Sequence, residues 1–133
     1  MKRTIITAAL LLSYSFGVYA GELKYICTVK QIFDLSFEGE LVKHEGPYES
    51  LVGNKFTIDR VSGDMIGLPF TTRSYKTITV LERGSEEMSY KAIVISHQPN
   101  IWVMHIEVRE FIGGKFKPFW GSEGGYIYSG LCE

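Results

Sequence analysis

Cys27 and Cys132 are the two cysteines of this chain, and they lie near opposite ends of its globular part. In an oxidising compartment, an even number of cysteines in a small domain is typical of a disulfide. A bond between them would close a loop of about a hundred residues, which stabilises the fold by about 4 to 5 kcal/mol in the chain-entropy model. The alternative is a pair of free thiols that bind a metal, but neither has a cysteine or histidine at ligand spacing. We therefore predict a disulfide.

The first twenty residues are typical of an export signal. Lys2 and Arg3 precede an apolar run over 5–12, and Val18-Tyr19-Ala20 places small residues at positions −3 and −1 of a cleavage site. The run is too short and too polar at its end to form a stable membrane-spanning helix, so we expect cleavage before Gly21 rather than an uncleaved anchor. We therefore predict that residues 1–20 are a signal peptide and that the chain is exported to the periplasm or the extracellular space.

The remaining segment, 21–133, is expected to form one domain with no linker or internal repeat. Without Lys2 and Arg3 it carries 12 basic and 15 acidic side chains, a net charge of −3. A nucleic-acid or anionic-membrane partner would favour a basic excess, so we expect neither nucleic-acid binding nor stable membrane insertion.

Short runs of alternating apolar and polar residues predict an all-β fold. Tyr25, Cys27 and Val29 alternate with polar residues, and the same period of two recurs at 55–59. The segment 75–82 is rich in β-branched and aromatic residues, which favour strands. Tight turns are expected at 60–64 and 83–85, where glycine takes a positive φ at little steric cost. The segment 35–45 comes nearest to a helical pattern, but its glycines and broken apolar stripe favour strand and loop.

The segments 88–96 and 101–110 predict a hairpin, and the apolar pattern selects its register. With 96–100 as the loop, Val94 faces Trp102, and three further pairs lie on the same apolar face: Ala92 with Met104, Tyr90 with Ile106, and Met88 with Val108. We therefore expect Val94 and Trp102 to pack together in the core.

Together these patterns predict an antiparallel meander of about eight strands. A disulfide between the first and last strands would place them side by side and close, or nearly close, a β-barrel, which removes exposed sheet edges. A two-sheet β-sandwich is the alternative.

No pattern of catalytic or metal-binding residues stands out. His44, His97 and His105 are not at local ligand spacing, so we expect no metal site and no cofactor. His105 could act as a general base with Glu107, although a histidine beside a carboxylate on a strand is more often a solvated pair. Acidic residues such as Asp59 and Asp64 flank turns, where carboxylates usually stabilise the turn itself.

The segment 111–126 is the strongest candidate for binding because it combines glycines, aromatic residues and two lysines. Its candidate binding residues are Lys115, Phe116, Lys117, Phe119, Trp120 and Tyr126. Pro118 lacks a donor N–H, so we expect this segment at a sheet end rather than within the sheet. The alternative is a hairpin at Gly113-Gly114 whose aromatic side chains fill the end of the core.

Several stretches resemble small exported bacterial proteins of unassigned function. They are Cys27-Thr-Val-Lys-Gln-Ile32, Phe56-Thr-Ile-Asp-Arg-Val-Ser-Gly63, Gly84-Ser85 with Ser89-Tyr-Lys-Ala92, and Lys117-Pro-Phe119. The resemblance extends over most of 21–133, but its motifs are turns and cysteines. It implies export and a β-rich domain, and it implies no activity.

The sequence therefore favours a non-enzymatic exported domain that binds a small apolar ligand or a protein, including as an inhibitor. The alternative is a small extracytoplasmic hydrolase that uses scattered carboxylates and a histidine. A desolvated Glu/His pair in a cleft would favour the hydrolase. An apolar cavity would favour a small ligand, and an apolar surface patch would favour a protein partner.

Overall fold

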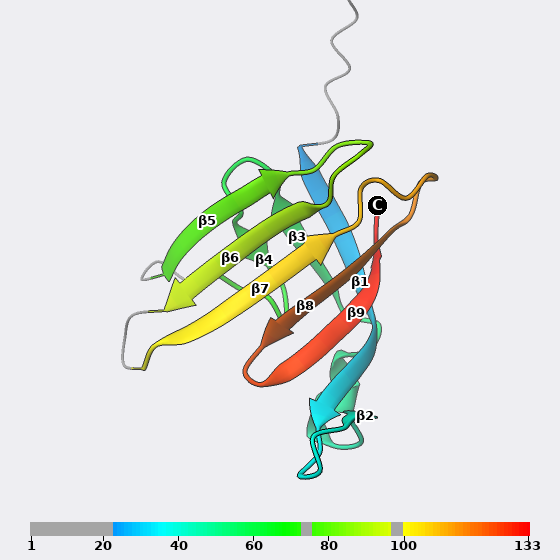
Figure 1. Cartoon of the computed structure of the whole chain (residues 1–133), viewed down its shortest axis with the longest axis vertical. Helices are drawn as coiled ribbons and strands as arrows, with labels where there is room; N and C mark the ends of the chain where they lie inside the picture. The colour runs from blue at the N-terminus through cyan, green and yellow to red at the C-terminus, as the bar shows by residue number, and fades with distance from the viewer. Residues whose placement is uncertain (1–22, 73–75, 97–99) are drawn as a thin grey trace, which may run out of the picture.

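The computed structural model of this chain describes residues 23–72, 76–96 and 100–133 (Figure 1). The predicted signal peptide, 1–20, its cleavage site, Tyr75 and His97 lie outside the described residues. Within the described ranges, no helix is long and apolar enough to cross a bilayer.

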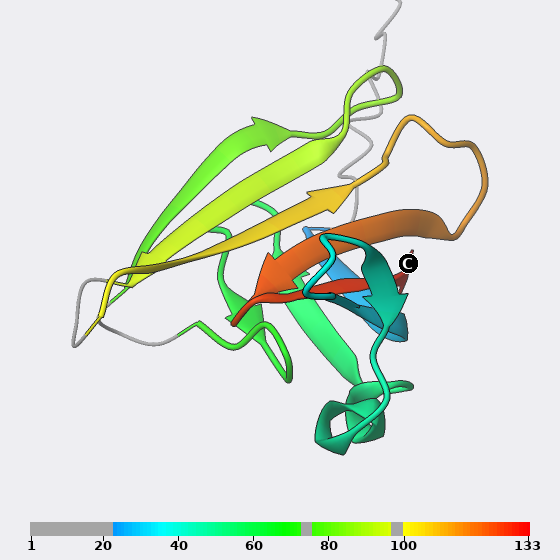
Figure 2. The ribbon, with the colours of Figure 1, turned by 60° about the horizontal axis from the view of Figure 1, so that its bottom comes forward.

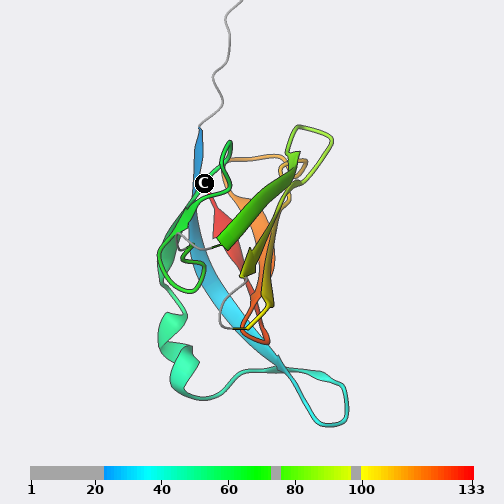
Figure 3. The ribbon, with the colours of Figure 1, turned by 90° about the vertical axis from the view of Figure 1, so that its left-hand side faces the viewer.

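The described residues form an all-β domain, as the alternation predicts. One antiparallel sheet of eight strands curls through 265° into an open half-barrel (Figures 1 and 3). The elements are β1 (Lys24–Leu35), β2 (Leu41–Lys43), the short 3₁₀ helix η1 (Pro47–Leu51), β3 (Lys55–Asp59), β4 (Met65–Ile66), β5 (Lys76–Arg83), β6 (Tyr90–Ser96), β7 (Trp102–Val108), β8 (Lys117–Glu123) and β9 (Tyr126–Cys132).

The strand order around the sheet is β4-β3-β1-β9-β8-β7-β6-β5, and β2 pairs separately with the end of β1. The first and last strands are neighbours, as predicted, and Cys27 lies directly opposite Cys132. Their pairing joins the two halves of the meander, but the opening of the barrel lies elsewhere, between β4 and β5. Figure 3 shows β3 and β4 on one side and β5 to β7 on the other.

β4, the edge strand on one side of the opening, ends after two residues. A side chain at Gly67 would approach the backbone oxygen of Lys55 to 2.7 Å, and φ there is +113°, so glycine is required. Pro69 then lacks the N–H that would continue the ladder. The chain leaves the sheet and places Phe70 in the core.

The inner face of the half-barrel is filled by side chains. Tyr25, Cys27 and Val29 of β1 point inward, as the alternation predicted. Burial of each large apolar side chain contributes about 1.5 to 3 kcal/mol. The rest of the buried core comes from β1, β3, β4, β6 to β9 and the segment after β4: Ile32, Phe56, Ile58, Met65, Phe70, Tyr90, Ala92, Val94, Met104, Ile106, Val108, Phe119, Tyr128 and Cys132.

The predicted register of the β6–β7 hairpin was wrong by two residues. Val94 lies opposite Met104, and Trp102 lies opposite Ser96, so β6 ends at Ser96 and β7 begins at Trp102. A shift of two residues keeps every side chain on its predicted face, so the apolar pattern could not separate the two registers. Two residues predicted on the apolar face are therefore less buried than expected. Met88 lies outside the strand and is 47% exposed, and Trp102 is only partly buried.

The turn that joins β3 to β4 confirms the predicted role of its acidic residue and its glycine. The carboxylate of Asp59 accepts hydrogen bonds from the backbone N–H groups of Ser62 (2.9 Å) and Val61 (3.0 Å), and Gly63 has φ of +78°. These hydrogen bonds, that from Ser62 first, lower the pKa of Asp59.

The region 35–51 forms an extension at the far end of β1. Leu41–Lys43 adds a short strand, as the glycines of 35–45 suggested, and Pro47 starts η1, which the sequence analysis did not identify. Figure 2 shows η1 projecting below the curled sheet, and Figure 1 places the extension at the opposite end from the C-terminus.

Candidate functional site

The six predicted binding residues do not form one cluster: two precede β8, three lie on β8, where the pleat directs neighbours to opposite faces, and Tyr126 lies on β9. Phe119 points inward, is 3% exposed and packs against Phe56 with ring centroids 5.3 Å apart. Trp120 points outward and is 37% exposed. Phe119 therefore fills the core, as the alternative for this segment held, and Trp120 lies on the outer surface.

The prediction that this segment lies at a sheet end rather than within the sheet was wrong for 118–120, whereas Lys117 is the first residue of β8. Pro118, Phe119 and Trp120 all pair with β9, and the last two also pair with β7. Pro118 is tolerated because the β7–β8 ladder ends beside it: its carbonyl accepts a hydrogen bond from Arg109 N (2.8 Å), and the position of its missing N–H lies beyond the last paired residues.

Trp120 and Tyr126 belong to two other surface regions. Trp120 packs against His105, with ring centroids 4.7 Å apart. Burial lowers the pKa of His105, although the nearby charge of Glu107 acts in the opposite direction. Tyr126 lies at the far end, where its ring centroid is 4.9 Å from that of His44 and 4.8 Å from that of Tyr48.

The residues named for a hydrolase are also dispersed. His44 Nδ1 lies 3.8 Å from Asp34 Oδ2 at the far end, whereas His105 lies on the outer face of β7. Neither histidine lines the two pockets described next. Among the residues that the structure places, no group of three histidine, cysteine or acidic side chains is arranged to hold a metal ion.

Lys115, Phe116 and Lys117 come together at one end of the half-barrel, which we call the rim. Here β1 and β8 begin, β9 ends, and the 109–116 loop leads from β7 into β8 (Figure 1). Two neighbouring pockets open at the rim, each of about 170 Å³, and Glu133 lines both. Three of the six predicted residues therefore share one surface.

The first rim pocket is cationic. Its lining contains four basic and two acidic side chains together with a tyrosine: Lys24, Tyr25, Arg60, Glu110, Lys115, Lys117 and Glu133. Both acidic side chains have basic partners within the pocket, since Arg60 Nη1 lies 3.2 Å from Glu110 Oε1 and Lys115 Nζ lies 2.8 Å from Glu133 Oε2. The hydrogen bond from Lys115, followed by its charge, lowers the pKa of Glu133.

Lys117 is held differently from the other cations. Its ammonium group donates hydrogen bonds to two backbone carbonyls of the 109–116 loop, that of Glu110 (3.0 Å) and that of Ile112. Within the described residues no carboxylate lies within ion-pair distance of this group. Carbonyl oxygens fix the position of the charge but do not neutralise it, and an ammonium has a third hydrogen to donate.

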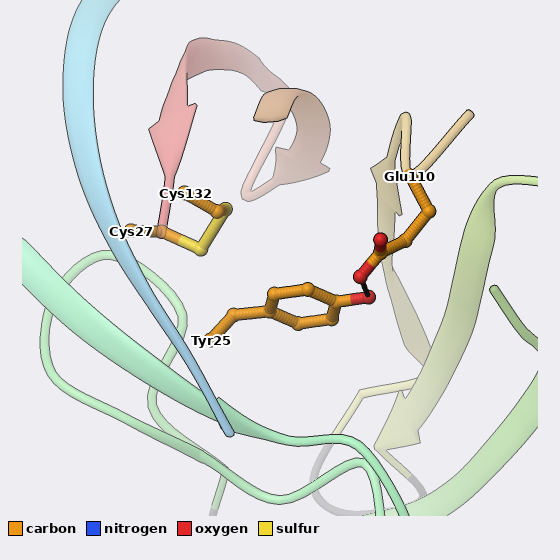
Figure 4. Close-up of a disulfide and its surroundings, with 4 residues drawn as sticks. All are labelled: Tyr25, Cys27, Glu110 and Cys132. Atoms are coloured by element: carbon orange, nitrogen blue, oxygen red, sulfur yellow. Dashed lines mark hydrogen bonds between the residues drawn. A yellow bond between two sulfur atoms is a disulfide. The ribbon is translucent and has the colours of Figure 1, made fainter. Parts of the chain in front are cut away.

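Tyr25 and Glu110 join the barrel to the loop across 85 residues of sequence. The Tyr25 hydroxyl donates a hydrogen bond to Glu110 Oε1 (Figure 4). The Arg60 guanidinium lies 4.7 Å from the centre of the Tyr25 ring. Burial first, and then the bond to Glu110, raises the pKa of Tyr25 far above its usual range. Burial, with the negative charge of Asp59, raises the pKa of neighbouring Tyr90 to about 12.

The second rim pocket is largely apolar and lies on the outer face of β1 and β9. It is lined by Ile26, Thr28, Lys30, Phe116, Leu131 and Glu133. Ile26 and Leu131 are exposed, and Phe116 is 54% exposed. Three large apolar side chains thus line one small concave surface beside the cationic pocket.

The predicted disulfide is present (Figure 4), and the residues adjacent to it in sequence, Ile26 and Glu133, line the pockets. Cys27 and Cys132 are fully buried, and the next residues, Ile26 and Glu133, exchange backbone hydrogen bonds of 2.8 and 2.9 Å. The bond therefore holds the strand ends that carry Ile26, Leu131 and Glu133.

Sequence reasoning missed Tyr25, Arg60 and Glu110 as residues of the site. Tyr25 was identified only as an inward-facing core residue, and nothing local connects it with Glu110. The available signal was the disulfide: once β1 and β9 are adjacent, the beginning of β1 must lie beside the end of β9 and the beginning of β8.

Comparison of the chain with protein-family models, with curated proteins and with solved structures finds no match. The functional argument therefore depends on the geometry of the rim.

Proposed function

We propose that this chain is an exported, non-enzymatic binding domain that holds a protein partner at the rim. The single observation that carries the proposal is the pair of neighbouring pockets, one cationic and one apolar, that share Glu133. Concave surfaces that combine apolar side chains with a few placed polar groups are typical of binding sites.

The size of the pockets favours a protein over a small apolar ligand. Pockets for drug-sized ligands usually measure about 300 to 1,000 Å³, whereas each rim pocket measures about 170 Å³. An engineered apolar cavity of about 150 Å³ holds one benzene molecule. Each pocket is therefore suited to one side chain, and the inner face of the barrel is filled by core residues.

Export is supported by two independent features. The first twenty residues have the pattern of a signal peptide, and the disulfide is of a kind that persists in oxidising compartments and is rare in the cytosol.

Site-specific photocrosslinking in the cells that produce the protein tests the proposal. A photoreactive phenylalanine replaces Phe116 at the rim or, as a matched control, Phe37 in the exposed turn between β1 and β2. We expect the Phe116 variant to form a discrete adduct with another protein and the Phe37 variant not to form it. No adduct at 116, or the same adducts at both positions, contradicts binding at the rim.

A further inference from the structure

We infer that the rim recognises its protein partner through two anchors from one short segment: a large apolar side chain in the apolar pocket and an aspartate or glutamate side chain in the cationic pocket. This inference rests on the proposed function and specifies the chemistry of the partner.

The apolar anchor follows from the exposed side chains of Ile26, Phe116 and Leu131. Their pocket has room for one ring or one branched aliphatic side chain. Contiguous exposed apolar side chains that border polar groups are typical of contact surfaces. A partner side chain that covers them would remove apolar area from water on both proteins.

The carboxylate anchor follows from the charges that surround the neighbouring pocket. Four basic side chains line it, while Glu110 and Glu133 are engaged with Arg60 and Lys115. One of the four, Lys117, is a cation whose position is fixed by two carbonyls of the loop. A carboxylate that accepts the third hydrogen of this ammonium would gain a charge-assisted bond, with little ordering of the lysine side chain.

Glu133 fixes the position of the two pockets relative to each other. It lines both pockets, and its backbone is hydrogen-bonded to that of Ile26 beside the disulfide. The two pockets are therefore adjacent and fixed relative to each other. A single segment of a few residues can fill both, and the partner's acidic residue must lie close in sequence to its apolar residue.

A random nonapeptide library displayed on phage tests this chemistry. Each peptide is fused through its C-terminus, so a free terminal carboxylate is not presented. Selection on the disulfide-bonded domain, 21–133, should enrich peptides with an acidic residue within a few positions of a large apolar residue. Enrichment of apolar peptides without acids, enrichment of basic peptides, or no enrichment overturns the inference.

An enriched peptide is then synthesised with blocked termini, together with versions in which the acid becomes an amide or the apolar residue becomes alanine. Lys117→Gln should weaken binding of the acidic peptide about tenfold and leave binding of the amide version unchanged. Phe116→Ala should weaken binding of the apolar peptide and have little effect on its alanine version. Equal effects on both versions would contradict the assigned contacts.

Matched controls separate these contacts from changes in folding. Lys43→Gln and Phe37→Ala make the same chemical changes at exposed positions of the far end and should leave affinity unchanged. Lys117→Arg keeps the charge and should retain most of the affinity. If Lys117→Arg weakens binding as much as Lys117→Gln does, Lys117 only shapes the loop, and the carboxylate anchor is wrong.

The two experiments separate failure of the inference from failure of the proposed function. A specific adduct at position 116, with no acidic preference among peptides, keeps the rim as a binding surface and removes the two-anchor chemistry. Absence of an adduct at 116 removes the proposed function itself.

Discussion

The two ends of β1 both place aromatic rings beside ionisable side chains, yet the structure holds them in different ways. At the rim, a disulfide, the Tyr25–Glu110–Arg60 contacts and the two bonds of Lys117 connect β1, β8, β9 and the 109–116 loop. At the far end, β2 consists of three exposed residues, and η1 buries none of its side chains. There His44 contacts Asp34 at 3.8 Å and packs against Tyr126.

This difference bears on which end is suited to binding. Groups that are held in place before a partner arrives lose less conformational freedom when they bind it. Segments with few buried contacts open at low free-energy cost. The rim therefore has the preformed geometry that a selective site needs, and the far end should be the first part of the described domain to open.

Among the substitutions that test this difference between the rim and the far end, removal of the disulfide should lower the stability of the domain most. In Cys27→Ser/Cys132→Ser, the free energy of unfolding should fall by about 4 to 5 kcal/mol, because the bond closes a loop with a sequence separation of 105 residues. Guanidinium unfolding of the 21–133 domain measures the loss. A loss below about 1 kcal/mol would mean that noncovalent contacts alone hold the rim.

Substitutions on the two faces of β8 should have the next largest effect on stability, and the two faces should differ. Phe119→Ala should destabilise the domain by about 3 to 5 kcal/mol, because it leaves a cavity in the core. Trp120→Ala should cost about 1 kcal/mol, since its ring is partly exposed and lies on the surface. Thermal and denaturant unfolding measure both. Similar costs would mean that the outer face is also covered, for instance by a second copy of the chain.

Loss of the Tyr25 hydroxyl should have a smaller effect at the rim. Tyr25→Phe removes the hydrogen bond to Glu110 and should cost about 1 to 2 kcal/mol at neutral pH. Folding raises the pKa of Tyr25. The stability that its neutral hydroxyl contributes is therefore complete below the unfolded pKa, about 10, and declines as the pH rises above it.

Unfolding measured between pH 8 and 11 checks this pH dependence. The decline above pH 10 should be shallower in Tyr25→Phe than in the unsubstituted domain. The matched variant Tyr48→Phe changes a half-exposed tyrosine of the far end and should preserve the original slope. Identical slopes in all three proteins would contradict the role of Tyr25.

Loss of His44 should have the smallest effect on global stability. His44→Ala removes ring contacts with Tyr48 and Tyr126 and should lower the free energy of unfolding by about 1 kcal/mol. Backbone amides of 41–53 should nevertheless exchange much faster, because local opening becomes easier. Hydrogen exchange measures this, with amides of β6 and β7 as the internal reference. Unchanged exchange in 41–53 would mean that the far end is held as firmly as the rim.

Much of the fold could be predicted because its signals are local. The alternation of Tyr25, Cys27 and Val29 identifies an inward face without any knowledge of neighbouring strands. The Asp59–Gly63 turn carries its own hydrogen-bond acceptor and its own left-handed residue. The register of β6 and β7 failed because a shift of two residues preserves each face, so the pattern contains no information that selects between the alternatives.

The candidate site could be predicted only in part. Lys115, Phe116 and Lys117 were identified by their unusual composition, and they do line the rim pockets. Phe119, Trp120 and Tyr126 were grouped with them because they are close in sequence. The pleat of β8 and the reversal into β9 send these three to the core, the outer face and the far end. Proximity along a strand does not imply a shared surface, since successive side chains point in opposite directions.

The sequence by itself determined the strand content, the inward residues and the adjacency of the first and last strands, because these depend on period-two patterning and on one covalent bond. The tertiary structure decided where the barrel opens and which residues form the rim. β4 ends where Gly67 passes close to the backbone of Lys55, and the rim depends on the contact of Tyr25 with Glu110. Both contacts join residues from different strands or loops, and only the curvature and register of the whole sheet bring such residues together.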